Sequence, residues 1–236
     1  MANKEQSSDK SEKESSKGPI MFEGNINKLN DEDAITEDLM KEKESRGRSS
    51  NAYMIKLVLI GDAAVGKTSI RQRYLGQGFQ REHLTTLGAD FAAITKEVDE
   101  YVIKYQIWDL AGQPMFKNVR PRFFKGCFGA LAVFDITRKD TFLNLGSWIE
   151  ELYHYSGRGV VPIIMLANKT DLEDSLEVTK EEAEEFVEEL NKKTKEFSIE
   201  NFFLATSAKT GLNIDKAFGI IGQYIVERFS STDNED

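Results

Sequence analysis

Apolar residues after about position 53 fall into two kinds of segment that alternate along the chain. One kind is a short, nearly unbroken apolar run, which is typical of a buried strand. The other has apolar residues every three or four positions, which is typical of an amphipathic helix. Strands are predicted at residues 54–60, 91–98, 101–108, 130–136, 161–167 and 202–206, with a tight turn at Asp99-Glu100 between the second and the third.

Helices are predicted between these strands. The first runs from Lys67 to about Leu75, and a later one opens on a capping box formed by Thr179 and Glu182. The buried face of that later helix is formed by Ala183, Phe186, Val187 and Leu190. Two further apolar faces have helical spacing: Leu145, Trp148, Ile149 and Leu152; Ile214, Phe218, Ile221, Ile225 and Phe229. The alternation predicts an α/β fold with a six-stranded, mostly parallel sheet, one antiparallel edge strand and helices on both faces.

Residues 1–52 differ from the rest, because they are rich in charged and polar residues and poor in large apolar ones. Such a segment is predicted to be a disordered N-terminal extension. In an alternative interpretation, Asn30 caps a short helix with Ile35 and Leu39 on one face, which docks on a partner or on the folded domain. The folded domain is predicted over residues 53–229, followed by a short acidic tail at 230–236.

Composition and charge disfavour several classes of partner and of cellular location. A net charge of −9 disfavours a nucleic-acid partner, because binding a phosphate backbone needs clustered lysines and arginines. The single cysteine, Cys127, cannot form an internal disulfide, which favours a reducing compartment. The N-terminus lacks the apolar segment of a secretory signal, and the apolar runs are too short to span a membrane. A cytoplasmic protein is therefore expected.

Residues 61–68 match the pattern G-x-x-x-x-G-K-[ST] between a predicted strand and a predicted helix, where a phosphate-binding loop must lie. Backbone N–H groups of such a loop and of the helix N-terminus face an anion. Lys67 adds a cation near the β- and γ-phosphates, and the Thr68 hydroxyl offers a position for Mg²⁺. The pattern does not distinguish ATP from GTP. The expected phosphate-contacting residues are Gly61, Asp62, Ala63, Ala64, Val65, Gly66, Lys67, Thr68 and Ser69.

A second motif predicts which base is bound. Residues 168–171, with the sequence Asn-Lys-Thr-Asp, follow a predicted strand and so point into the same crevice as the phosphate loop. The carboxylate of Asp171 can accept hydrogen bonds from two neighbouring N–H donors of guanine, a pair that adenine lacks. Asn168 and Lys169 belong to the same run. The next strand is followed by a second candidate base-contacting loop, which consists of Ser207, Ala208 and Lys209.

Together these motifs resemble those of Ras-superfamily small GTPases, most of all the Rab branch. The resemblance covers about residues 54–229 and rests on motifs in the expected order: residues 61–68, Thr86, residues 108–113, residues 168–171 and residues 207–209. It implies a P-loop NTPase G domain that binds GTP and GDP with Mg²⁺, hydrolyses GTP slowly and acts as a nucleotide-dependent molecular switch. It also implies a part in vesicle trafficking.

The resemblance implies roles for residues in the two switch segments. Thr86 would ligate Mg²⁺ and sense the γ-phosphate, and Asp109 would hold Mg²⁺ through water. The Gly112 amide would bind the γ-phosphate, and Gln113 would orient the attacking water. The implied metal ligands are therefore Thr68, Thr86 and Asp109, and the implied catalytic residues are Gln113, Lys67 and Thr86.

Further implied roles involve aromatic residues and a backbone amide. Phe79 would stack near the guanine, and Ala208 would donate its backbone N–H to the base. Phe91, Trp108 and Phe123 match an aromatic triad on which effectors of Rab proteins dock. Ordinary core packing is the alternative interpretation of that triad.

Three features depart from the family pattern. Ala63 and Ala64 occupy positions where many relatives have Gly or Ser, and the family implies that side chains there crowd the transition state. Pro114 follows Gln113 where Glu is usual, which stiffens this segment and puts the usual exchange-factor mechanism in doubt. The C-terminal residues include no cysteine, so no lipid anchor is expected. The expected partners are an effector, an exchange factor and a GTPase-activating protein.

Two rivals of the switch hypothesis remain open. A nucleotide-binding interaction module that barely hydrolyses GTP is favoured by Ala63 and Pro114, whereas an ATPase is opposed by Asp171. A separate question is whether the chain carries its own catalytic arginine, which in related enzymes stabilises the transition state. The arginines considered for that role are Arg71, Arg73, Arg120 and Arg122, for which salt bridges on helix faces are the simpler interpretation.

Overall fold

The computed structural model describes residues 52–78 and 86–232. The predicted N-terminal extension, with its Ile35 and Leu39 patch, therefore lies outside the described residues apart from its last position. Phe79 and the last four residues of the predicted acidic tail also lie outside them.

A six-stranded sheet forms the centre of the molecule, in the order β2-β3-β1-β4-β5-β6. Only the edge strand β2 runs antiparallel, against β3, and the other neighbouring strands are parallel. The predicted class, strand number and antiparallel edge are confirmed. The strands are β1 (Ala52–Ile60), β2 (Ala89–Val98), β3 (Tyr101–Leu110), β4 (Gly129–Asp135), β5 (Ile163–Asn168) and β6 (Phe202–Ala205).

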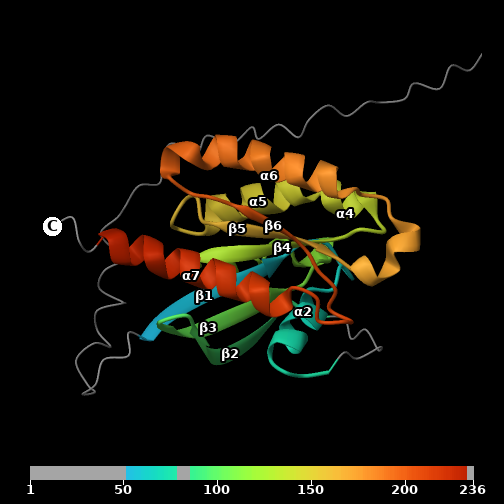
Figure 1. The fold of residues 1–236 in the computed structure, drawn as a ribbon. Helices are drawn as coiled ribbons and strands as arrows, with labels where there is room; N and C mark the ends of the chain where they lie inside the picture. Colours follow the sequence, from blue (N-terminus) through green and yellow to red (C-terminus); the bar gives the residue numbers. More distant parts are fainter. Residues whose placement is uncertain (1–51, 79–85, 233–236) are drawn as a thin grey trace, which may run out of the picture.

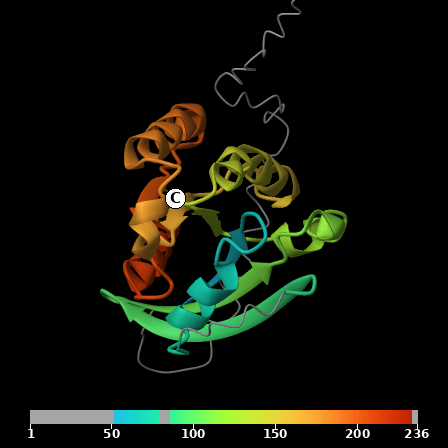
Figure 2. The ribbon, with the colours of Figure 1, turned by 90° about the vertical axis from the view of Figure 1, so that its right-hand side faces the viewer.

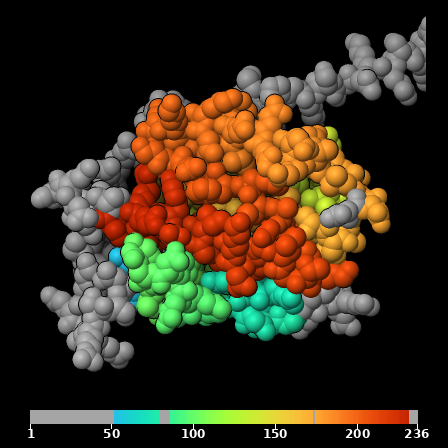
Figure 3. All heavy atoms as spheres, in the orientation of Figure 1, coloured from blue at the N-terminus to red at the C-terminus, as the bar shows by residue number. Residues whose placement is uncertain are grey.

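Helices cover both faces of this sheet (Figures 1 and 2). One face packs against α3, α4, α5 and α6, and the other packs against α2 and α7. In Figure 3, which shows one side of the molecule, α6 lies above α7, and α2 and the turn between β2 and β3 lie below α7. The α-helices are α2 (Lys67–Tyr74), α3 (Pro121–Phe124), α4 (Lys139–Leu143), α5 (Leu145–Tyr155), α6 (Lys180–Thr194) and α7 (Ile214–Thr232). The short 3₁₀ helices are η2 (Pro114–Phe116), η3 (Thr170–Ser175) and η4 (Lys195–Phe197).

Several element boundaries differ by a few residues from those expected; β2, for example, begins at Ala89 rather than at position 91, and β3 ends at Leu110 rather than at position 108. β1 begins at Ala52 rather than at position 54, and α7 continues to Thr232, into the stretch expected to be a tail. β5 begins at Ile163 rather than at position 161. Pro162 has no N–H to donate to a ladder, and its carbonyl accepts from Ala130 N at 3.0 Å, so the paired strand starts one residue later.

The core explains why the central strands read as unbroken apolar runs. Every residue of β4 and β5 is buried, since helices cover both of their faces. On the α2 and α7 side, Tyr74 stacks on Phe218 with ring centroids 3.7 Å apart. The Tyr105 hydroxyl donates to the Phe218 carbonyl at 2.9 Å, which satisfies its buried polar atom. Both helices are thereby fixed to the sheet on which the site is built.

The first prediction concerns the capping box of α6. Thr179 Oγ1 accepts from Glu182 N at 3.2 Å, and Glu182 Oε2 accepts from Thr179 N at 2.9 Å. We expect Thr179→Ala to lower the free energy of unfolding by about 1 kcal/mol, because a helix N–H loses its acceptor. Urea denaturation with excess GDP measures this. Glu185→Ala, on an exposed position of the same helix, is the control and should be nearly neutral. An equal effect of both substitutions would show that the cap contributes nothing.

Candidate functional site

The loop between β1 and α2 lies at the carboxyl ends of the parallel strands, the end of the sheet that Figure 2 faces. The positive φ angles of Gly61 (130°) and Gly66 (104°) favour glycine. Space requires it as well: a Cβ at Gly61 would lie 2.1 Å from the Val133 carbonyl oxygen, and one at Gly66 would lie 2.2 Å from Asn168 Nδ2. Gly66 caps α2 without a side-chain hydrogen bond, so the first N–H groups of the helix can face an anion.

Lys67 is the buried cation of this loop. It is only 5% exposed, and its Nζ donates to the carbonyls of Gly61 and Asp62 at 2.7 Å each. Burial lowers the pKa of Lys67 to about 8, while Asp109 and Asp62 act in the opposite direction. An anion placed at the loop would favour the charged lysine, so the loop is electrostatically suited to bind phosphate.

The three predicted metal ligands meet beside the loop. Thr68 Oγ1 donates to Asp109 Oδ2 at 2.5 Å and lies 2.9 Å from Thr86 Oγ1. Asp109 is fully buried, its Oδ1 has no hydrogen-bond partner among the described residues, and burial raises its pKa. The part of the chain that the structure describes holds no cluster of three or more His, Cys, Asp or Glu side chains that could bind a metal alone. One carboxylate with two hydroxyls fits Mg²⁺, which takes its remaining ligands from phosphates and water.

The two predicted base-contacting loops lie together and contact the phosphate loop. Asn168 connects them: its Nδ2 donates to the Val65 carbonyl at 2.7 Å, and its Oδ1 accepts from Ala208 N at 3.1 Å. Asp171 accepts from Ser207 Oγ at 2.6 Å. These bonds bring residues 61–68, 168–171 and 207–209 to one edge of the sheet.

The carboxylate of Asp171 is ionised and aligned. Lys209 Nζ lies 3.2 Å from Asp171 Oδ2, in addition to the bond from Ser207. Partial burial acts to raise the pKa of Asp171, but the bonds from Ser207 and Lys209 outweigh it and hold the pKa below its ordinary value. The group can therefore accept hydrogen bonds at neutral pH.

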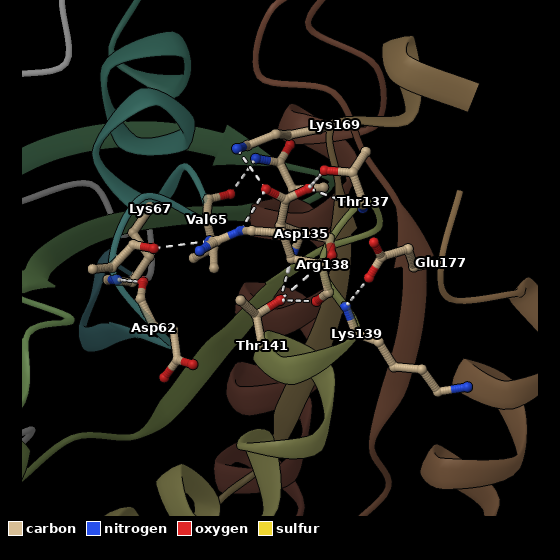
Figure 4. Close-up of polar contacts among 12 residues, drawn as sticks. Asp62, Val65, Lys67, Asp135, Thr137, Arg138, Lys139, Thr141, Lys169 and Glu177 are labelled. Atoms are coloured by element: carbon tan, nitrogen blue, oxygen red, sulfur yellow. Dashed lines mark hydrogen bonds and ion pairs between the residues drawn. The ribbon is translucent and has the colours of Figure 1, made fainter. Parts of the chain in front are cut away.

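Figure 4 shows a charged cluster that the sequence reasoning missed. Asp135, at the end of β4, pairs with Lys169 Nζ at 2.6 Å and with Arg138 Nε at 3.2 Å. Arg138 Nη2 also donates to the Ala63 carbonyl at 2.9 Å, and this hydrogen bond connects the charged cluster to the phosphate loop. Burial acts to raise the pKa of Asp135, but Lys169 and Thr137 outweigh it, so the pKa is lowered. The position of Asp135 at the carboxyl end of a parallel strand is the signal that could have identified it.

The segment that begins at Gly112 lies against the phosphate loop. A Cβ at Gly112 would lie 2.3 Å from Ala63 N and 2.5 Å from the Asp62 carbonyl oxygen, so only glycine fits. The Oε1 atom of Gln113 is buried and has no hydrogen-bond partner among the described residues. Gln113 thus has an unused acceptor on the segment that contacts the phosphate loop.

The side chain of Arg120 is hydrogen-bonded to the backbone of the segment that begins at Gly112. Its Nη2 donates to the Gln113 carbonyl at 3.0 Å and to the Gly112 carbonyl at 3.4 Å. The same guanidinium pairs with Glu151 at 3.3 Å and lies 3.8 Å from the centre of the Trp148 ring. The Trp148 Nε1 atom in turn donates to Asp62 Oδ1 at 2.8 Å, and Asn144 donates to Asp62 Oδ2 at 2.7 Å. A continuous set of contacts therefore connects α5, the Gly112 segment and the phosphate loop.

The other arginines considered as internal catalytic groups also have partners or face solvent. Arg71 pairs with Asp90, and Arg73 Nη2 donates to the Thr210 carbonyl at 2.8 Å. Arg122 is exposed on α3. For Arg71 and Arg120 the salt-bridge interpretation describes what the structure shows, although both are buried rather than on exposed helix faces.

The predicted aromatic triad forms one cluster. The Phe91 and Trp108 rings lie 5.0 Å apart, and the Trp108 and Phe123 rings lie 5.4 Å apart. Phe91 is 47% exposed, and Trp108 and Phe123 are partly buried. The triad therefore packs against the core through Trp108 and Phe123 and exposes Phe91 to solvent.

A glycine-rich loop at the start of a helix, a Thr68–Asp109 pair beside it and two polar loops at the same edge of the sheet are the features of a P-loop nucleotide-binding domain. Residues 56–227 match the model of the Ras family. The chain is also similar to the Ras-related protein Rab11B of Nicotiana tabacum, with 38% identity over 173 residues that cover 73% of this chain and 75% of that protein.

The chain therefore belongs to the Ras family of small GTPases, in its Rab branch. It is a GTP hydrolase that acts as a nucleotide-binding molecular switch, and regulators and effectors are its general class of partner. In the described part of the chain, no helix is long and apolar enough to cross a membrane.

The second prediction tests Arg120. We expect Arg120→Ala to lower single-turnover GTP hydrolysis by at least about tenfold, equivalent to about 1.4 kcal/mol in the barrier, because the carbonyls next to Gln113 lose their donor. GTP affinity should stay within about threefold, since Arg120 contacts the switch segment and not the base loops. Arg122→Ala, on the exposed side of α3, is the control. A wild-type rate in Arg120→Ala would show that Arg120 does not position Gln113.

Proposed function

We propose that the residues at the carboxyl edge of the sheet bind GTP and GDP in the orientation set by Asn168. The observation that carries this proposal is that one side chain bonds both Val65 in the phosphate loop and Ala208 in the base loop. The spacing between a phosphate site and a base site is thereby fixed before a ligand binds. Such preorganisation reduces the entropy lost on binding.

The proposed base site reads guanine through Asp171. Its ionised carboxylate accepts the two N–H donors of guanine. The stem of Lys169 and the Ala208 N–H, which would exchange its bond to Asn168 Oδ1 for one to the base, complete the site. Adenine would supply neither of these two donors to the carboxylate, at a cost of about 1–3 kcal/mol. This supports GTP over ATP. Phe79 remains a predicted stacking residue outside the described part of the chain.

Thr68, Thr86 and Asp109 are proposed to hold Mg²⁺. Their oxygen atoms already meet through hydrogen bonds, and Asp109 Oδ1 is buried without a partner. When bound, Mg²⁺ would neutralise negative charge on the β- and γ-phosphate oxygens. Thr86 belongs to a segment that a bound γ-phosphate can order, which is how such switches sense their nucleotide.

In the proposed reaction the protein acts mainly by position and charge. Lys67 stabilises charge that develops on the phosphoryl oxygens, and the Gly112 N–H binds the γ-phosphate. Gln113 and the Thr86 carbonyl orient the attacking water. Among the described arginines near the loop, Arg120 and Arg138 are engaged by backbone carbonyls and carboxylates. The intrinsic rate should therefore be low.

The proposed effector surface is the cluster of Phe91, Trp108 and Phe123. Met115 in η2 is 79% exposed and Leu87 is 81% exposed, so apolar side chains are also exposed on the segments around Gln113 and Thr86. A surface that includes switch residues changes with the bound nucleotide, as an effector site requires. We propose the cytoplasm as the location, because Cys127 is a free, buried thiol.

The third prediction tests hydrolysis. We expect wild-type single-turnover GTP hydrolysis with excess Mg²⁺ at or below about 10⁻³ s⁻¹, the range of unassisted relatives. Gln113→Leu should lower the rate further without lowering GTP affinity, because Gln113 acts on water and not on the bound nucleotide. Equal rates in the two proteins would remove Gln113 from the mechanism and favour a module that only binds GTP.

The fourth prediction tests base selection. We expect Asp171→Asn to weaken GTP binding and to improve binding of xanthosine triphosphate, because an amide can donate to the extra carbonyl of xanthine, which a carboxylate repels. Competition against a fluorescent nucleotide measures both affinities. Asp174→Asn in the same loop is the matched control and should change neither. Guanine affinity within about twofold of wild type would contradict the proposed base site.

A further inference from the structure

Arg71 lies inside α2 next to the proposed metal site. Its side chain is 8% exposed, and its Nη2 pairs with Asp90 on β2. Its Nε atom is buried, has no hydrogen-bond partner among the described residues, and lies 3.9 Å from Asp109 Oδ2. The sequence motifs assign no function to this residue, and the proposed reaction does not use it.

The charge of Arg71 acts on the carboxylate to which Mg²⁺ would be attached. Asp109 is fully buried, so a cation 3.9 Å away is poorly screened by solvent. Asp90 is 56% exposed, so water screens the carboxylate that partly offsets Arg71.

The positive charge of Arg71 opposes the binding of a divalent cation at Asp109, because it reduces the negative potential that attracts the metal. It also lowers the cost of losing the metal, since Asp109 then keeps a cationic neighbour. Both effects act in the same direction and weaken metal retention.

We propose that Arg71 is a fixed counter-cation of the magnesium site, which raises the Mg²⁺ concentration needed to retain GDP. The proposal rests on the Mg²⁺ site proposed above. GDP release from this chain is then adjusted by a residue on α2 that touches neither the base nor the phosphate loop's glycines.

A purely structural role for Arg71 predicts the opposite sign. If the residue served only to attach β2 to α2 through Asp90, its removal would loosen Asp109 and Thr68 and weaken Mg²⁺ retention. The electrostatic role predicts that removal of the charge strengthens Mg²⁺ retention. The direction of the change therefore separates the two roles.

The experiment measures release of a fluorescent GDP analogue from the full chain across buffered concentrations of free Mg²⁺. The quantity compared is the Mg²⁺ concentration that gives half of the maximal protection against release. Arg71→Met removes the charge and keeps an apolar stem, and Arg71→Gln removes the charge and keeps a donor for Asp90. Arg71→Lys retains the charge, and Arg122→Met makes the same charge change at an exposed site on α3.

We expect the Met and Gln variants to need at least about threefold less Mg²⁺ than wild type, because the opposing charge is gone. Arg71→Lys keeps the positive charge near Asp109 and Arg122→Met leaves it in place, so both should stay within about twofold of wild type. If Arg71→Met does not fold, Arg71→Gln decides. Unchanged or higher Mg²⁺ requirements in the neutral variants overturn the proposal. Release of GDP from wild type that does not respond to Mg²⁺ at all would overturn the magnesium site itself, a result distinct from failure of the Arg71 effect.

Discussion

The site depends on how closely the loop after β1 approaches its neighbours. Three glycines lie where a single added carbon atom would overlap other backbone or side-chain atoms: Gly61 against β4, Gly66 against Asn168, and Gly112 against Ala63 and Asp62. Because these contacts leave no space for a side chain, the loop packs directly on Asn168 and on the segment that begins at Gly112. The phosphate loop and its two neighbours therefore form one packed unit.

Positive charge around the loop is held in place by backbone carbonyls. Lys67 donates to Gly61 and Asp62, Arg138 donates to Ala63, and Arg120 donates to Gln113. Arg120 and Arg138 both act to lower the pKa of Lys67, so each arginine lies close enough to repel that lysine. A protein with a net charge of −9 thus concentrates cations at one edge of its sheet. The arrangement is stabilised by an anion, and a nucleotide polyphosphate supplies one.

The sequence predicted the sheet, the order of its motifs and the capping box of α6, because each of these depends on residues close together in the chain. Unbroken apolar runs predicted β4 and β5, whose faces are both covered. The start of β5 was misplaced because Pro162 interrupts the ladder, a local effect that the apolar pattern conceals. The motifs at residues 61–68, 168–171 and 207–209 are recognisable by their places after predicted strands, whereas Thr86 and the roles of residues 108–113 rest on the resemblance.

The cations could not be predicted in the same way. Arg138 contacts Ala63, which is 75 positions away in the sequence, and Arg120 contacts Glu151, 31 positions away. Their partners depend on the path of the chain between them, so a local pattern shows only that an arginine is present. The same limit explains why Arg71 was interpreted as a helix-face residue, although it is buried against β2 and β3.

The arginines and Pro114 together indicate where control of the nucleotide state lies. Pro114 occupies the start of η2, where a missing N–H costs nothing, and its fixed φ suits the turn. Arg120 donates to the carbonyls of Gly112 and Gln113, the two residues that precede Pro114. The beginning of this segment is therefore restrained both by the proline ring and by these hydrogen bonds. An exchange factor that displaced this restrained segment would first have to break these contacts. In the proposal above, Arg71 opposes the metal on the other side of the site, so nucleotide release is adjusted there rather than at the segment that begins at Gly112.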